Sequence, residues 1–482
     1  MFWRGVWGYL PANLVQGLVG ILSILVFTRL LTPEEFGRYA LGFSVMSLAH
    51  TVLFTWLEAA MARFWAAQTD RQSMADHFAT LYRAFAWLTA AFVPAAAVGL
   101  WLWPAGAPLK WAVAAGLSAI LARSLVRLVQ ERRRAAGEVS ASARLDMGQT
   151  AGGFAAGAAL AALGLGGAAP LLGLAIAAAA LLPFALPREL KAAEDGRFDP
   201  ARLKTYAHYG FPVSAAMILA LVLASADRFL IAAFLDEASV GAYHAAYSLS
   251  NRTLDVIFLW LGAAGAPALV MAFERGGREA LERAAREQVS TILLVALPAA
   301  AGLALVARPL AEVMVGEGLR DAAALVTPWI ALAALFGGLA THYLLHAFTL
   351  GRRTKLLLLA SCAPVIVNVA LNLVLIPRYG LIGAAWTTAA TYAFAAAAYA
   401  ILGRRAQPLP IPLATLAKAL AATAVMAAAV VAVPAMGGLV ELAAKALVGA
   451  VVYAAAALVL DVAHVRAPAS RVLKALQARF AT

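Results

Sequence analysis

The chain has 482 residues, of which 63% are hydrophobic and only 13% charged, and its formal net charge is +13. This composition lies well outside the range of soluble globular proteins. The basic residues lie between apolar segments, so the charge does not indicate nucleic-acid binding, and one cysteine, Cys362, excludes a disulfide framework and a cysteine-based metal site. We therefore expect an all-α, polytopic membrane protein.

Apolar runs of roughly 20 residues, long enough to cross a bilayer as a helix, occur along the whole chain. The first run continues to Thr28 with no small-residue cleavage site after it, so it is predicted to be a retained span and not a signal peptide. Fourteen spans are predicted, over residues 6–28, 39–62, 82–103, 111–130, 147–166, 170–187, 209–234, 241–272, 289–307, 323–349, 356–376, 382–402, 413–433 and 439–460.

The distribution of Lys and Arg predicts the orientation of these spans, because cytoplasmic loops carry the excess of positive charge. With the N-terminus inside, 28 of the 38 basic residues lie on the cytoplasmic side and six on the opposite side. An even number of spans then places both termini in the cytoplasm. The tail 461–482 alternates apolar and basic residues, a pattern typical of an amphipathic helix on an anionic membrane surface.

The sequence contains an internal repeat. LTPEEFGRYALGFS from Leu31 aligns with LDEASVGAYHAAYS from Leu235, which pairs Gly37 with Gly241. The same offset aligns Pro94 with Pro298, and slightly larger offsets align two further segments in the same order, one of them Arg123/Arg127 with His342/His346. Six spans per copy is an even number, so the two copies share one orientation, as in transporters built from parallel repeats.

This repeat predicts four parts of the chain. Two six-helix lobes cover residues 1–190 and 205–405, two additional transmembrane helices cover 413–460, and the basic amphipathic tail covers 461–482. Parallel six-span lobes enclose a space that opens alternately to either side, so transport is the expected activity.

Three segments resemble the oligosaccharide flippases of the MOP superfamily, the Wzx-type O-antigen and exopolysaccharide flippases. They are RLLTPEEFGRYAL from Arg29, DRFLIAAFLDEASVGAYHAAYSLSNR from Asp227 and NVALNLVLIPRYGLIGAA from Asn368. With the span pattern, the resemblance covers essentially the whole chain. The third segment is also found in multidrug members, so it supports the fold more than the cargo.

The resemblance implies a bacterial inner-membrane protein whose basic central cavity is lined mainly by spans one, two, seven and eight. It implies an undecaprenyl-pyrophosphate-linked oligosaccharide as cargo. Some relatives have twelve spans and the lipid II flippase branch has fourteen, so the number of spans does not identify the glycan.

Ionisable residues within spans are costly to insert, so each is a candidate site residue. Arg252, in the eighth span, is the leading substrate-binding candidate, because a guanidinium binds phosphate bidentately. Asp255 lies three residues later, and the alternative is that the two side chains neutralise each other. Arg228 and Asp227 lie near the periplasmic end of the seventh span, where snorkelling to the interface is equally expected.

Two further candidates, Arg29 and Arg63, lie at the ends of the first two predicted spans. Arg29 is an interface anchor or, as the resemblance implies, a cavity or gate residue. Glu58 and Arg63 are predicted to form an inner gate pair, or else to lie at a solvated helix end. Asp227, Asp255 and Glu58 are the carboxylates predicted to couple a proton or cation.

Arg123 and Arg127 are four residues apart and therefore share one helix face. They either attract phosphate in a cytoplasmic vestibule or contact lipid headgroups, and headgroup contact is slightly favoured. His342 and His346 occupy the aligned positions, but no carboxylate or cysteine with ligand spacing accompanies them, so a metal site is not indicated.

The sequence has no phosphate-binding P-loop, HExxH or GxSxG motif, so we predict a transporter without enzymatic activity or cofactor. Three alternatives remain: a multidrug or cation antiporter of the same superfamily, which needs an acidic or neutral cavity; a lipid II flippase; and a membrane-embedded glycosyltransferase or polymerase. The expected partners are the lipid-linked oligosaccharide, membrane lipids and the polymerase and ligase machinery of polysaccharide assembly, and no nucleic acid.

Overall fold

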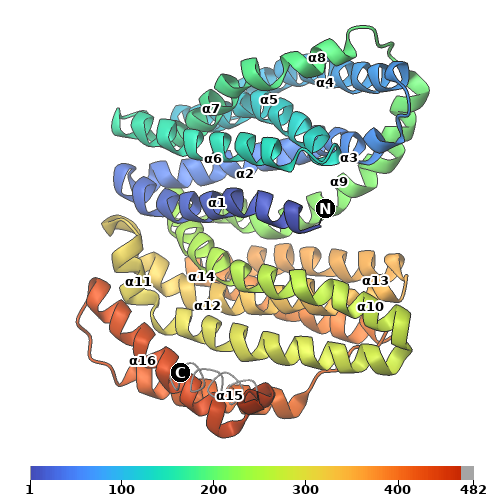
Figure 1. Cartoon of the computed structure of the whole chain (residues 1–482). Coiled ribbons are helices and arrows are strands. Elements are labelled where there is room, and N and C mark those ends of the chain that lie inside the picture. Colours follow the sequence, from blue (N-terminus) through green and yellow to red (C-terminus); the bar gives the residue numbers. More distant parts are fainter. Residues whose placement is uncertain (1, 468–482) are drawn as a thin grey trace, which may run out of the picture. The chain divides into compact units, whose positions relative to one another are not determined.

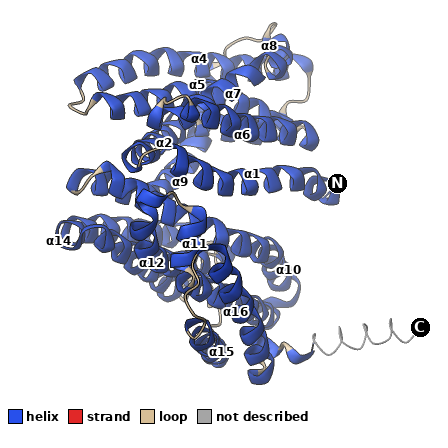
Figure 2. Cartoon of the chain, turned by 90° about the vertical axis from the view of Figure 1, so that its left-hand side faces the viewer, coloured by secondary structure: helices blue, strands red, loops and turns tan. Residues whose placement is uncertain are grey.

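The computed structural model describes residues 2–467, and within this range every regular element is a helix (Figures 1 and 2). The predicted all-α class is confirmed. By its contacts the chain divides into two compact units, Met1–His244 (unit 1) and Ala245–Thr482 (unit 2). The predicted tail lies almost entirely beyond residue 467 and therefore outside the described residues.

Unit 1 contains nine helices in the described range and the start of a tenth. They are α1 (Phe2–Leu30), α2 (Pro33–Leu53), α3 (Thr55–Phe64), α4 (Arg71–Leu102), α5 (Ala107–Ala135), α6 (Val139–Ala162), α7 (Ala169–Ala185), α8 (Pro187–Ala193), α9 (Pro200–Phe234) and the beginning of α10 (Glu237–Leu305).

Unit 2 contains the rest of α10 and six further helices among the described residues. They are α11 (Ala307–Met314), α12 (Arg320–Leu339), α13 (His346–Leu350), α14 (Thr354–Gly403), α15 (Leu413–Val431) and α16 (Gly438–Leu460). A single π-helical turn, Ala340–Leu344, joins α12 to α13.

Ten helices in the described range are long and apolar enough to cross a membrane, or eleven if α2 and α3, which are bent by 47°, form one span. Two of the ten are each two helices in succession, because Gly277 in α10 (φ 63°) and Gly380 in α14 (φ 61°) leave the helical conformation. The left-handed region is open to glycine without the steric penalty of a Cβ. Both breaks fall between predicted spans. The predicted fifth span lies mostly on α6, which is not among the ten.

The sequence of the Leu31 repeat explains how α2 begins. Thr32 caps the helix: its hydroxyl accepts from the backbone N–H of Glu35 (3.3 Å), while the Glu35 carboxylate accepts from the Thr32 backbone N–H (3.0 Å). Pro33 occupies the first turn, where its missing N–H costs nothing. The start of α2 is therefore fixed by local chemistry.

The two glycines that the repeat aligns, Gly37 and Gly241, lie against each other. A Cβ on Gly37 would overlap the carbonyl oxygen of Glu237, and one on Gly241 would lie 2.7 Å from the carbonyl oxygen of Pro33. Beside this crossing, Arg38 Nε donates to Glu237 Oε2 over 2.5 Å. Only residues without a side chain allow α2 and α10 to approach this closely.

Gly37→Ala is expected to destabilise the protein by about 1–3 kcal/mol, because the added methyl group meets backbone that cannot rotate away. Gly17→Ala is the matched control, since a Cβ there meets nothing within 4 Å and alanine is the better helix former. Thermal unfolding in detergent measures both. Equal melting temperatures for the two variants would contradict the close packing at Gly37.

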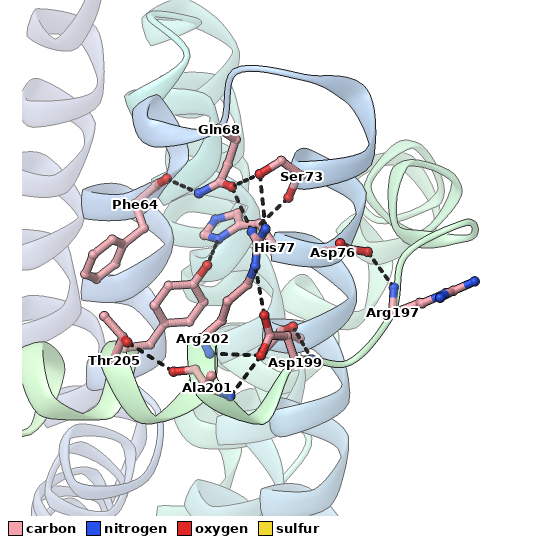
Figure 3. Close-up of polar contacts among 12 residues, drawn as sticks. Phe64, Gln68, Ser73, Asp76, His77, Arg197, Asp199, Ala201, Arg202 and Thr205 are labelled. Atoms are coloured by element: carbon pink, nitrogen blue, oxygen red, sulfur yellow. Dashed lines mark hydrogen bonds and ion pairs between the residues drawn. The ribbon is translucent and has the colours of Figure 1, made fainter.

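A polar network holds the segment between α8 and α9 against the start of α4 (Figure 3). Arg202 donates to Gln68 Oε1 (2.8 Å), to the Ser73 carbonyl (3.1 Å) and to Asp199 Oδ2 (3.2 Å). Gly196 is needed nearby, because a Cβ there would overlap the backbone of Ala75. Helix α9 then packs on α2 and α3. By contacts, unit 1 thus extends to His244, whereas the lobe boundary inferred from the repeat stays a prediction.

In unit 2, α16 is anchored at its first residue. Glu312 of α11 accepts a hydrogen bond from the backbone N–H of Gly438 (2.7 Å) and another from Arg308 Nε (2.9 Å). The Gly438 N–H, with Arg308 second, holds the pKa of the Glu312 carboxyl below its usual range. This contact satisfies one of the free N–H groups at the helix start.

Candidate functional site

Unit 1 contains a cavity of about 430 Å³ with a polar, cationic wall. Its polar residues come from α2 and α5, and α9 closes it with an apolar surface. The lining residues are Phe43, Met46, Ser47, His50, Thr51, Ile120, Arg123, Arg127, Met217, Ala220, Leu221 and Ala224.

Helical spacing explains why these side chains meet. On α2, Ser47, His50 and Thr51 are three and four residues apart, and Arg123 and Arg127 have the same relation on α5, so each set lies on one helix face. The sequence predicted the shared face of the two arginines. The cavity now shows that this face turns toward α2 and α9.

The guanidinium groups of Arg123 and Arg127 are not engaged in ion pairs with described residues. Arg123 is half-buried, and its Nη1 approaches the Met46 sulfur at 3.5 Å, which is a weak acceptor; Arg127 is exposed. Among the described residues, no carboxylate lies within ion-pair distance of either guanidinium. Two adjacent guanidinium groups without a paired carboxylate are suited to binding an anion such as phosphate.

His50 occupies the polar wall between the arginines and a buried carboxylate. Its Nδ1 lies 2.8 Å from Ser124 Oγ, and its Nε2 lies 3.2 Å from Glu58 Oε1. His50 Nε2 and Glu58 Oε1 are close enough for a hydrogen bond, but their geometry does not form one. The contact is an ion pair only when the imidazole is protonated. Glu58 is 8% exposed, so a carboxylate is held inside unit 1 next to a histidine.

The bend between α2 and α3 makes this contact. In a straight helix, residues eight apart are separated by about 12 Å along the axis. The 47° bend at Phe54 lets Glu58 of α3 turn back to His50 of α2. The predicted pairing of Glu58 with Arg63 is therefore not what the structure has: Arg63 is exposed, with its guanidinium 5.8 Å from the centre of the Phe64 ring.

Asp227 and Arg228 are buried inside unit 1, 1% and 7% exposed. Asp227 accepts a hydrogen bond from the Tyr243 hydroxyl (2.6 Å), and Arg228 lies 3.5 Å from the hydroxyls of Ser44 and Ser225. Neither residue lines the cavity. Their proposed roles in binding and coupling stay predictions.

Arg29, Arg252 and Asp255 lie elsewhere. Arg29 is exposed at the end of α1 and donates to the Leu25 carbonyl (2.8 Å). Arg252 and Asp255 are exposed residues of α10 in unit 2, and no ion pair joins them within the described part of the chain. The two charges still interact electrostatically, so the binding role of Arg252 and the alternative in which the two charges neutralise each other both stay predictions.

A second cavity, in unit 2, has about 740 Å³ but an apolar lining from α10, α15 and α16. Lys445, its charged lining residue, is already paired with Glu441 over 2.6 Å. This cavity offers nothing for an anionic group. His342, aligned by the repeat with Arg123, stacks on Phe258 with ring centres 5.8 Å apart, and no group of three metal-ligating side chains occurs in the range described.

Sequence reasoning missed Ser47, His50, Thr51 and Ser124. A signal was present for the first three, since a histidine flanked by hydroxyl residues at helical spacing is unusual in an apolar span. The participation of Ser124 follows only from the packing of α5 on α2.

Residues 26–324 match the sequence profile of a family described as polysaccharide biosynthesis protein. That range is more than half of the chain and includes the entire cavity of unit 1. A search of curated proteins finds no significant match.

Solved membrane transporters share the fold. The lipid II flippase MurJ in an inward closed conformation is 12% identical, with a TM-score of 0.77 over 94% of this chain and 98% of that one. An inward-facing multidrug resistance MATE family transporter of the MOP superfamily is 16% identical, with a TM-score of 0.60 over 81% and 94%. A MATE transporter from Vibrio cholerae is 14% identical, with a TM-score of 0.55 over 84% and 96%.

At these identities the likeness establishes the fold and not the cargo. The fold agrees with the one expected from the three sequence segments, and the family profile shows that the chain belongs to the polysaccharide biosynthesis proteins. This chain belongs to the polysaccharide biosynthesis protein family and has the multi-pass fold of the MOP-superfamily membrane transporters.

Proposed function

We propose that this protein flips an undecaprenyl-pyrophosphate-linked oligosaccharide from the cytoplasmic to the outer leaflet of the bacterial inner membrane by alternating access through a cationic cavity. One observation carries the proposal most directly. Arg123 and Arg127 line a cavity, and among the described residues no carboxylate lies within ion-pair distance of either guanidinium. The family of polysaccharide biosynthesis proteins supplies the cargo class.

The chemistry of the headgroup sets what the cavity must do. A pyrophosphate diester carries negative charge that water solvates well and hydrocarbon does not. Guanidinium groups replace that hydration with charge-assisted hydrogen bonds, which are stronger in a low-dielectric cavity than in bulk water. Ser47 adds a hydroxyl to the same wall, beside Thr51, whose hydroxyl donates to the Ser47 carbonyl over 2.8 Å. The apolar residues of α9, such as Met217 and Leu221, complete the enclosure.

The positive charge of the residues that line the cavity argues against the multidrug or cation antiporter. Such a protein needs an acidic or neutral site, whereas the residues that line this cavity include two arginines and no carboxylate. The lipid II flippase MurJ has a higher TM-score against this chain than the MATE transporters. Lipid II, however, is itself a prenyl-pyrophosphate-linked glycan. The cavity chemistry is therefore the same for both, and the family profile favours polysaccharide assembly.

A deletion strain tests the cargo. Without this protein, prenyl-linked repeat units are expected to accumulate on the cytoplasmic leaflet while surface polysaccharide is lost. Leaflet-specific labelling of the prenyl-linked glycan, with surface glycan measured in parallel, gives the result, and re-expression from a plasmid is the control. Normal surface glycan in the deletion strain would count against flipping.

A further inference from the structure

The position of His50 links the cavity to a buried carboxylate. The imidazole lines the cavity beside Ser47 and Thr51, and its far nitrogen faces Glu58. Both side chains are largely buried, 15% and 10% exposed. A proton on this imidazole is therefore held in place by the Glu58 carboxylate, and its charge adds to that of the cavity wall.

The charges around His50 come from several helices. Glu58 is on α3, and Arg123 and Arg127 are on α5. Glu131 of α5 interacts with Glu58 and with Arg127. Glu58 and Asp146 of α6 interact with Arg123. On the opposite wall, the lining residues of α9 carry no charge. His50 thus lies between the positive charges of α5 and the negative charge of Glu58.

We infer that His50 and Glu58 form a proton-binding site that controls the anion affinity of the Arg123/Arg127 cavity. This inference rests on the proposed function. It adds that binding of the diphosphate headgroup is coupled to binding of one proton. Thermodynamic reciprocity requires both halves of this statement, because an anion that binds more tightly to the protonated site must also draw a proton onto it. Histidine suits the role, since its charge ordinarily changes between pH 5 and 8.

The sign of the pH dependence follows. Protonated His50 places one more positive charge at the cavity wall, so anion affinity rises as pH falls and declines as the imidazole loses its proton. A coupling of ordinary size changes affinity by about 5–150-fold between the two states.

Titration of the purified full-length protein in nanodiscs tests the inference. The probe is methanedisulfonate, which mimics a diphosphate but keeps its charge of −2 across the experiment, so any pH dependence belongs to the protein. Calorimetry from pH 5.5 to 8.5 is expected to show affinity about ten-fold higher at the acid end. Measurement at one intermediate pH in two buffers of different ionisation enthalpy is expected to show uptake of a fraction of a proton.

Three variants assign the effect. His50→Asn, whose amide replaces the Nδ1 contact to Ser124, is expected to bind the probe with an affinity that no longer varies with pH. Glu58→Gln is expected to move the pH midpoint downward, because the charged imidazole loses its counter-ion. His346→Asn, a half-buried histidine of unit 2, is the matched control and keeps the wild-type profile.

The outcomes separate this inference from the proposed function. Binding that depends on Arg123 and Arg127 but is unchanged by pH, or a pH profile retained in His50→Asn, overturns the proton site and leaves the anion site standing. No binding of the probe at any pH overturns the anion site, and the proton inference fails with it.

Discussion

Replacing Arg123 and Arg127 together by glutamine is expected to reduce transport at least about 100-fold. Hydrogen bonds to charged groups contribute about 1.5–3 kcal/mol each, so two such contacts to a pyrophosphate correspond to this loss. Glutamine keeps the polarity of the side chains and removes their charge. Surface polysaccharide restored to a deletion strain, normalised to the amount of inserted protein, measures the effect.

Arg378→Gln is the matched control for this double variant, because it removes an exposed positive charge from α14 with no described contact. It is expected to transport normally. Normal transport by the double variant would show that the cavity charges are dispensable, and the headgroup would have to bind elsewhere.

Arg252→Ala is expected to lower transport about ten-fold or more while leaving stability unchanged. The side chain is exposed on α10, and no ion pair to a described residue is lost with it. If Arg252 contributes to cargo binding and not to packing, its replacement lowers transport and leaves the melting temperature unchanged. Proteoliposome transport and thermal unfolding of the same preparation measure the two quantities.

Asp255→Asn serves as the companion to Arg252→Ala, because it removes the neighbouring charge of opposite sign. If Arg252 binds cargo, the two variants differ in transport. If Arg252 instead faces acyl chains, removing its charge raises the melting temperature and transport is unchanged, which would eliminate Arg252 from the site.

The sequence allowed most of the fold to be predicted, because each feature was local. The length of the apolar runs predicted the spans, and Gly277 and Gly380 ended helices where the pattern of runs broke. The repeat that aligned Gly37 with Gly241 had a structural cause, since both glycines are needed at one helix crossing. Local chemistry and periodicity were sufficient for these features.

The site was only partly predictable. Spacing placed Arg123 and Arg127 on one face but left open whether that face meets lipid headgroups or a cavity, because the orientation of α5 depends on α2 and α9. The contact between His50 and Glu58 depends on the bend at Phe54, where the chain has neither proline nor glycine to announce it. Of the two interpretations of Glu58 and Arg63, the gate pair is not found: Glu58 lies against His50, and Arg63 is exposed at the end of α3.

The direct test of a cationic cavity that accepts an anionic lipid headgroup is transport by the purified protein in liposomes. A fluorescent prenyl-pyrophosphate-linked oligosaccharide in the inner leaflet becomes accessible to an external quencher only when it is flipped. The protein is predicted to flip this lipid, with inhibition by methanedisulfonate, and to leave an organic cation such as ethidium in place. Transport of the cation without flipping of the lipid would contradict the account.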